Sequence, residues 1–286
     1  MIQYGEDTFK SSLQAMWKQC FPQDSDAFIA FYFDKIYTND ESLMYLEDGC
    51  PVAFLQMIPY PVKIGNGIRS GGYLSGVMTA PDYRKRGYME KLLNASFDEM
   101  VNKGYACSFL IPQEEWLFDF YGKYGYLPAF QERQSIFQEV TAPKKSLILC
   151  DKKVHIYTSL SEIDIPDVYA VYDRFLMEKP NVILKTPQQF EAMLWVFFDE
   201  KGILFANDWG IAFAFSTGTQ TILKEFFYHD SEMKTEFLHA INGYFPQQKI
   251  TVLNDENAPF LRYKGMIKPL TDAPVSPDIY MSQMLD

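Results

Sequence analysis

The chain has 286 residues, 48% hydrophobic and 22% charged, a composition typical of a folded globular protein and not of a disordered one. Acidic residues outnumber basic ones by 37 to 26, and the resulting net charge of −11 argues against binding to nucleic acid or to an anionic membrane surface. Four scattered cysteines and three histidines show no metal or disulfide spacing, and no apolar run reaches transmembrane length. The start of the chain lacks a signal-peptide pattern, so we expect a cytoplasmic protein without a metal.

The first part of the chain predicts a mixed α/β fold. Apolar residues at helical spacing over 7–37 indicate two helices with a break at Phe21-Pro22. Two hairpins follow, with turns expected at Asp48-Gly49 and at 65–67, the latter joining strands at 62–64 and 68–73. We expect Gly71-Gly72 to permit a bulge or a turn.

Residues 74–93 combine a strand, a turn with Pro81, and the entry to a helix with an apolar stripe. The free amides of a helix start favour an anion, and Arg84, Lys85, Arg86 and the side-chain-free Gly87 are typical of a site for a phosphorylated ligand. The alternative is ordinary α/β construction with surface arginines. A strand expected at 106–111 would run parallel to the one before the helix, as in a crossover unit.

The second part of the chain follows the most linker-like stretch, at 142–146. Its order of predicted elements matches that of the first part, with a helix at 231–244 in the position corresponding to the one after Gly87. Asp230 and Glu232 stand at the start of this helix and would repel a pyrophosphate, so we do not expect a second cofactor site. The predicted strands and helices lie at 154–157, 165–178, 187–198, 203–206, 209–216, 221–228 and 249–253.

Residues 77–89 (VMTAPDYRKRGYM) resemble the acyl-CoA signature of the GNAT acetyltransferase superfamily, which is Gln or Arg, two residues, Gly, one residue, then Gly or Ala. Arg84 and Gly87 match. Met89 replaces the small final residue, and a larger apolar residue there is similar to tandem GNAT proteins of the enhanced-intracellular-survival (Eis) type. The segment Phe120–Tyr126 is similar to the family's Tyr-x-x-Phe/Tyr-Gly-Phe/Tyr segment after the fifth strand.

The resemblance implies an α/β fold of the α+β mixed-sheet type, built as tandem GNAT-like acyl-CoA N-acyltransferase domains. Residues 1–142 would be the catalytic domain and 143–286 a degenerate one that helps to shape the acceptor cleft, without the extra C-terminal lipid-carrier-like domain of long Eis members. Acetyl-CoA is the implied co-substrate, held between the fourth and fifth strands. Its implied contacts are Val77, Met78 and Thr79 for the pantetheine and thioester, and Arg84, Lys85, Arg86, Gly87, Tyr88 and Met89 for the pyrophosphate.

The resemblance also implies catalytic residues. Tyr121 matches the family tyrosine that protonates the CoA thiolate, a role suited to a phenol that is neutral at pH 7; taken alone, it could simply pack. In Eis-type proteins the C-terminal carboxylate reaches the active site, which here would be that of Asp286. Glu114 and Glu115 are further candidate bases, or else helix-capping charges.

We therefore predict an acetyl-CoA-dependent N-acetyltransferase that acetylates a primary amine of a small cationic molecule or a peptide by direct attack. The alternative is a catalytically inactive, GNAT-derived acyl-CoA-binding sensor, and a third possibility is a purely structural protein. The acidic surface would attract a cationic amine and disfavours nucleic acid and membrane partners. A homo-oligomer stays open, because no sequence pattern sets the oligomeric state.

Overall fold

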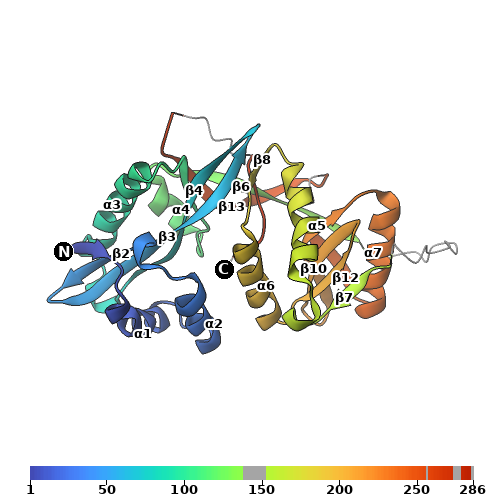
Figure 1. Cartoon of the computed structure of the whole chain (residues 1–286), viewed down its shortest axis with the longest axis horizontal. Helices are drawn as coiled ribbons and strands as arrows, with labels where there is room; N and C mark the ends of the chain where they lie inside the picture. Colours follow the sequence, from blue (N-terminus) through green and yellow to red (C-terminus); the bar gives the residue numbers. More distant parts are fainter. Residues whose placement is uncertain (138–152, 256, 273–277, 285–286) are drawn as a thin grey trace. The chain divides into compact units, whose positions relative to one another are not determined.

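The computed structural model describes residues 1–137, 153–255, 257–272 and 278–284. The chain divides into two compact units, each discontinuous in sequence (Figure 1). Unit 1 comprises Met1–Ala129 and Gly265–Pro277, and unit 2 comprises Phe130–Lys264 and Asp278–Asp286. The sequence predicts two consecutive halves; instead, a late segment belongs to unit 1. The predicted linker at 142–146 lies outside the described residues.

Unit 1 is a mixed sheet with strand order β1-β2-β3-β4-β5-β13. Strand β4 runs parallel to β5, and helix α3 connects them, as predicted for a crossover unit. The late strand β13 adds to β5 in the antiparallel sense over Met266–Pro269, which is why residues 265–277 belong to this unit. The elements are β1 (Ile2–Tyr4), α1 (Lys10–Cys20), α2 (Asp26–Phe31), β2 (Ser42–Glu47), β3 (Cys50–Ile64), β4 (Gly67–Thr79), α3 (Tyr88–Asn102), β5 (Cys107–Leu110), α4 (Trp116–Gly122), β6 (Leu127–Phe137) and β13 (Phe260–Pro269), the last two having residues in both units.

The hairpin of β3 and β4 is longer than the sequence predicts. Strand β3 continues through Pro59 and Pro61, and β4 is one strand from Gly67 to Thr79. Both prolines lie beyond Gln56, the last β3 residue that pairs with β2, so neither interrupts the β2–β3 ladder.

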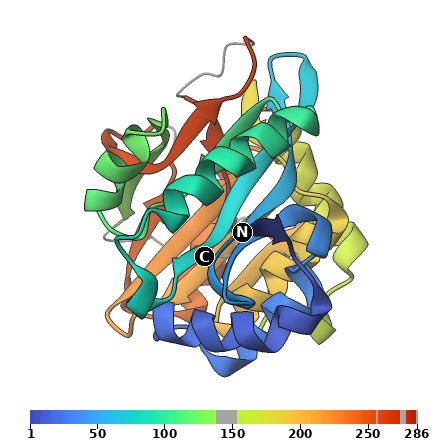
Figure 2. The same cartoon turned by 90° about the vertical axis from the view of Figure 1, so that its left-hand side faces the viewer.

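Helices cover both faces of the unit 1 sheet (Figure 2). Leu92, Leu93 and Met100 of α3 pack on one face, because they recur at helical spacing on one side of that helix. Leu13 and Trp17 of α1 pack with α2 on the opposite face, against Met44, Phe54 and Met78 of the sheet. The strand residues alternate between these two clusters, as the period of a strand requires.

Unit 2 is a second mixed sheet with strand order β6-β12-β11-β10-β9-β7, again with a parallel pair, β11 and β12, connected by a helix, α7. Helix α7 covers one face, while α5 and α6 pack on the other through rings such as Tyr172 and Phe197 against Phe213. The predicted mixed α/β fold is thus confirmed. The elements are β7 (His155–Tyr157), α5 (Ile165–Met177), β8 (Asn181–Ile183), α6 (Pro187–Asp199), β9 (Ile203–Asn207), β10 (Gly210–Ser216), β11 (Gln220–Tyr228), α7 (Ser231–Tyr244), β12 (Lys249–Leu253) and β14 (Tyr280–Met281).

No helix in the described part of the chain has the length and apolar character needed to cross a membrane. Within the same residues, no group of three or more His, Cys, Asp or Glu side chains is placed to hold a metal ion.

Candidate active site

The candidate site of unit 1 begins where β4 and β5 stop pairing. Their parallel register covers Gly71–Tyr73 and Cys107–Phe109, after which β4 continues to Thr79 without β5 beside it. Gly71 and Gly72 pair regularly with both neighbouring strands, so the bulge expected there is wrong. They are small for another reason: a Cβ at Gly72 would lie 2.3 Å from the Met100 sulfur of α3.

The bulge lies further along β4. Phe54 pairs with Met78 and Gln56 with Ser75, so Gly76 and Val77 together oppose one residue of β3. Gly76 has a positive φ of 58°, and a Cβ on it would lie 2.6 Å from a ring carbon of Trp17 in α1. Only glycine satisfies both conditions. The bulge lies in the part of β4 that no longer pairs with β5.

The bulge also decides which backbone groups of β4 are free. Ala80 donates its N–H to the Val52 carbonyl at 2.9 Å. Because hydrogen-bonded and non-bonded pairs alternate along an antiparallel ladder, Met78 bonds to Phe54, while the N–H and C=O groups of Thr79 point away from β3; Val77 lies in the bulge, where this alternation is interrupted. Of the three predicted pantetheine contacts, Thr79 therefore has its N–H directed away from β3, while its carbonyl already accepts from Arg84 Nε and Cys20 Sγ, and Met78 is bonded to Phe54.

The turn after β4 ends in an uncapped helix start. A 3₁₀ turn at Pro81–Tyr83 leads to Lys85 and Gly87, which have positive φ values of 63° and 77°. Gly87 is the N-cap of α3 without a side-chain cap, and a Cβ on it would meet no atom within 4 Å. Within the described residues, the amides of Tyr88 and Met89 have no acceptor, as expected for the first turn of a helix. This is an open anion-binding geometry.

The three cations of the turn have different surroundings. Arg84 donates from Nε to the Thr79 carbonyl at 3.2 Å, and this bond ties the turn to the end of β4. Arg86 donates to the Asp82 carbonyl at 3.0 Å and lies 3.8 Å from a carboxylate oxygen of Glu47. Lys85 makes no hydrogen bond or ion pair with another described residue, so its charge stays available for a ligand.

Tyr88 and Met89 direct their side chains inward. The Tyr88 ring lies 4.5 Å from that of Tyr45, and its hydroxyl donates to Glu47, a bond that raises the pKa of the phenol. Met89 packs against the hydrophobic cluster that includes Leu92 and Leu93. The bulk of Met89 therefore fills the core, and both residues offer a ligand their backbone amides instead of their side chains.

Tyr121 lies on α4, the helix after β5. It is buried, with 6% of its surface exposed, and its ring packs against Phe120 and Tyr126. It belongs to the same hydrophobic cluster as Val77 and Tyr88, so α4 and the end of β4 share one packed core. Burial raises the pKa of Tyr121, which keeps the phenol protonated throughout the neutral range. Its hydroxyl has no hydrogen-bond partner among the described residues.

The other predicted acid-base residues lie in different settings. Glu114 and Glu115 are exposed at the start of α4, where Glu114 accepts a 2.6 Å hydrogen bond from the Trp116 indole and Glu115 is the N-cap residue. Asp286 lies outside the described residues. The structure adds residues that the motifs do not indicate: Glu47, which holds Arg86 and Tyr88, and Lys268 of β13, which donates to the Tyr124 carbonyl at 2.7 Å.

A split parallel pair followed by an open, basic helix start is a geometry suited to a phosphorylated ligand. Residues 2–129 match the family model described as Acetyltransferase (GNAT) domain. The sequence matches no curated protein. Unit 1 therefore contains a GNAT acetyltransferase domain over residues 2–129, and the resemblance seen in the sequence is confirmed.

Solved structures with the same fold come from several bacteria. A protein from Enterococcus faecalis described as a probable N-acyltransferase has a TM-score of 0.77 at 13% identity, with 94% of this chain and 72% of that one covered. A GCN5-related N-acetyltransferase from Anabaena variabilis has a TM-score of 0.72 at 14% identity, covering 95% and 73%. Eis1 from Mycobacterium abscessus has a TM-score of 0.72 at 12% identity, covering 94% and 74%. At such identities the likeness establishes the fold.

Proposed function

We propose that unit 1 transfers the acetyl group of acetyl-CoA to a primary amine. The observation that carries the proposal is the open start of α3, where Gly87 leaves room and the amides of Tyr88 and Met89 have no acceptor among the described residues. These groups fit a pyrophosphate, since they combine fixed N–H donors with the charges of Arg84 and Lys85. Asp286, Glu114 and Glu115 remain the candidates for the base.

The end of β4 would hold the rest of the co-substrate. The Thr79 N–H points away from β3 and, with Val77 in the bulge beside it, suits the amides of the pantetheine arm. A backbone N–H at this position can also donate to the thioester oxygen as negative charge develops on it, which contributes to the rate through fixed dipoles. Arg84 links the end of β4 to the helix start, because its Nε donates to the Thr79 carbonyl while the residue lies at the exposed turn.

The reaction needs only aligned reactants and proton transfer. The amine, after losing one proton to a base, attacks the acetyl carbon; the new C–N bond forms, the nitrogen releases its second proton to solvent, and the C–S bond breaks. The departing thiolate takes the phenolic proton of Tyr121, which regains one from solvent. Burial suits Tyr121 to this role, because it disfavours the phenolate and keeps the proton in place until sulfur becomes negative.

The acceptor we propose is a small cationic amine or the amine of a peptide. The net charge of −11 creates an attractive field for such a molecule and so raises its encounter rate. The acidic field is a property of the whole chain, so it favours a class of acceptor and not one compound.

Two measurements test the proposal together: calorimetric titration with acetyl-CoA, and release of free thiol over a panel of polyamines, aminoglycosides and lysine-containing peptides. We expect saturable acetyl-CoA binding and amine-dependent thiol release. Binding without thiol release from any amine would favour the acyl-CoA sensor, and no binding at all would refute both functions. Arg84→Ala is the matched binding variant, with Lys63→Ala, a lysine outside the turn, as its control.

A further inference from the structure

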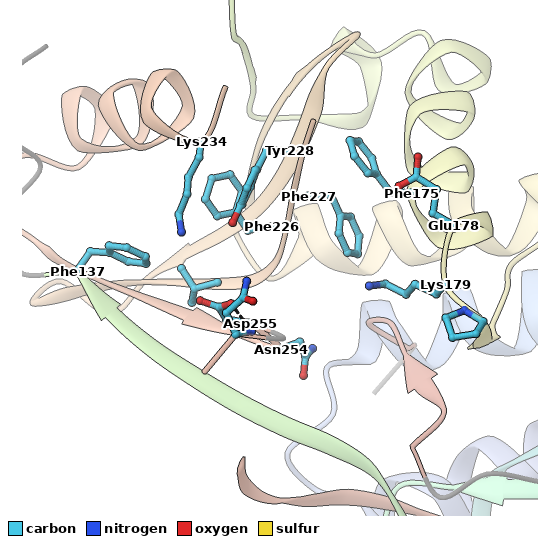
Figure 3. Close-up of a pocket in the computed structure, with 13 residues that line it drawn as sticks. Phe137, Phe175, Glu178, Lys179, Phe226, Phe227, Tyr228, Lys234, Asn254 and Asp255 are labelled. Atoms are coloured by element: carbon cyan, nitrogen blue, oxygen red, sulfur yellow. Dashed lines mark hydrogen bonds between the residues drawn. The ribbon is translucent and has the colours of Figure 1, made fainter. Parts of the chain in front are cut away.

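Unit 2 contains a pocket at the position that corresponds to the point in unit 1 where β4 and β5 stop pairing. Parallel pairing of β11 with β12 covers Gln220–Leu223 and Lys249–Val252 and then stops, while β11 continues to Tyr228. The pocket lies at this point and has a volume of about 380 Å³ (Figure 3). Such a volume is in the lower part of the range, roughly 300–1,000 Å³, of small-molecule sites.

The pocket is not suited to a second acyl-CoA. Where unit 1 has Gly87 and free amides, α7 has Asp230 as its N-cap, and the Asp230 carboxylate accepts the Met233 N–H at 2.9 Å. This and neighbouring hydrogen bonds lower the pKa of Asp230, so the helix start already holds a negative charge. Glu232 adds another in the first turn. A pyrophosphate would meet repulsion there.

Aromatic rings form much of the lining. Phe137, Phe226 and Tyr228 lie on one side of the pocket in Figure 3, and Phe175 and Phe227 on the other. Phe175 and Phe227 stack nearly parallel, with centroids 5.7 Å apart and planes 19° apart. Walls of this kind favour a flat, apolar body, because stacked and edge-on ring contacts stabilise it beyond the burial of its area.

Two lysines supply positive charge. Lys234 of α7 places its Nζ 5.0 Å from the ring centre of Phe137 and 5.3 Å from that of Tyr228, and it has no carboxylate partner among the described residues. Lys179 places its Nζ 4.3 Å from the Tyr280 ring and 5.4 Å from that of Phe227. Both ammonium groups turn into the pocket, as Figure 3 shows. Between aromatic faces, these ammonium groups are partly removed from water, which strengthens their attraction to an anion.

The lining also contains two acidic residues, Asp255 and Glu178. Asp255 already accepts the Ser135 hydroxyl at 2.7 Å and the Asn257 N–H at 3.0 Å. The Glu178 carboxylate turns away from the Lys179 ammonium (Figure 3). Further donors come from the backbone of β11. The His229 backbone N–H donates to the Trp209 carbonyl, and because bonded and non-bonded pairs alternate along the ladder, the N–H groups of Phe226 and Tyr228 point away from β10.

We propose that this pocket binds a small, planar organic carboxylate, that is, an aromatic acid. The ring of the ligand lies between the phenylalanine side chains of the two walls, and its carboxylate pairs with Lys234. The proposal concerns binding alone and does not depend on acetyl transfer in unit 1.

The full chain is titrated calorimetrically with benzoate, 4-hydroxybenzoate and 2-naphthoate, and with benzamide, which has the shape of benzoate without its charge. We expect at least one acid to bind about tenfold more tightly than benzamide, the difference that a charged hydrogen bond typically makes. Lys234→Met, which keeps the apolar stem, should remove this preference, and Lys234→Arg should retain it. Lys249→Met, at the exposed start of β12 and outside the pocket, is the control and should change nothing.

Several outcomes would overturn the proposal. They are the failure of all three acids to bind, an equal affinity for benzoate and benzamide, and an unchanged affinity in Lys234→Met. Competition separates the pocket from the unit 1 site: acetyl-CoA should not displace a bound acid. Displacement that is sensitive to Lys234 would show a second acyl-CoA site instead. Loss of acetyl-CoA binding in Arg84→Ala with intact acid binding would leave this proposal standing.

Discussion

Replacing Tyr121 by phenylalanine removes one oxygen from the candidate active site and keeps the packing of the ring. The Tyr121 centroid lies 5.1 Å from Phe120 and 5.7 Å from Tyr126, contacts that a phenylalanine retains. The hydroxyl has no hydrogen-bond partner within the described residues, so its loss leaves no partner unsatisfied. We therefore expect the free energy of unfolding to change by less than about 1 kcal/mol.

The effect of Tyr121→Phe on catalysis should be far larger. Loss of a general acid typically lowers turnover about 10²–10⁴-fold, which corresponds to roughly 3–5 kcal/mol at about 1.4 kcal/mol for each factor of ten. The Kd of acetyl-CoA should stay the same, because the phosphate contacts lie on the turn after β4. Thiol release at saturating amine measures the first quantity, and calorimetry measures the second.

Tyr124→Phe is the matched control, since Tyr124 lies in the same segment and is only partly buried. It should keep wild-type turnover. Turnover of Tyr121→Phe within threefold of that of the wild type would refute the role of the phenol. Because burial raises the pKa of Tyr121 above its ordinary value near 10, its ionisation should cause no alkaline loss of rate below about pH 10.

Three other substitutions test, in turn, co-substrate binding at Gly87, backbone strain at the Gly76 bulge, and the buried polar group Lys185. Gly87→Ala adds a Cβ in open space where phosphates would approach, so the Kd of acetyl-CoA should rise about tenfold or more with a small change in Tm. Gly76→Ala should instead destabilise the fold by about 2–4 kcal/mol in urea unfolding, because its Cβ meets Trp17 at a positive φ. Lys185→Met should cost about 1–3 kcal/mol, since the buried hydroxyls of Tyr172 and Ser282 lose the ammonium that donates to them. Burial raises the pKa of Glu225 and Lys185 opposes that rise, so adding Glu225→Gln, which needs no counter-charge, should recover part of the loss.

The hypothesis that the Asp286 carboxylate takes the proton of the amine has a test of its own. The chain should be shortened by its last two residues only, because Met284 is buried and its loss would disturb unit 2. Turnover should fall while acetyl-CoA binding stays the same. Unchanged turnover would leave Glu114 and Glu115 as the candidate bases.

The sequence predicts well those elements whose signals are local. The helix expected at 231–244 is α7 with the same bounds, because Asp230 caps it and its apolar residues recur at helical spacing. Strand β13 is different. Its Met266 pairs with Leu110, a residue far away in the chain, and periodicity describes the faces of a strand but not its partner. The return of residues 265–277 to unit 1 is therefore not predictable from the pattern alone.

The same contrast between local signals and contacts of distant residues applies to the candidate site. The motif from Arg84 to Met89 identifies the helix start, because its glycine and cations are neighbours in the sequence. The motif does not indicate Glu47 or Trp17, because both are distant from it in the sequence. Glu47 contacts Arg86 from β2, and Trp17 contacts Gly76 from α1. A glycine inside a strand can signal a bulge, but Gly71, Gly72 and Gly76 all satisfy that condition. Only the packing of Trp17 distinguishes the last of them.

The two units show how one fold can support different binding chemistry. In each unit a parallel pair splits, and a helix begins beside the split. The difference lies in the N-cap: Gly87 provides no side-chain cap to α3, whereas the Asp230 carboxylate accepts the Met233 N–H of α7. An internal cap removes the preference for phosphate but does not fill the space, because the split strands still line a pocket. Specificity there passes to the aromatic walls and to Lys234, which is why this one lysine is the decisive position for testing what unit 2 binds.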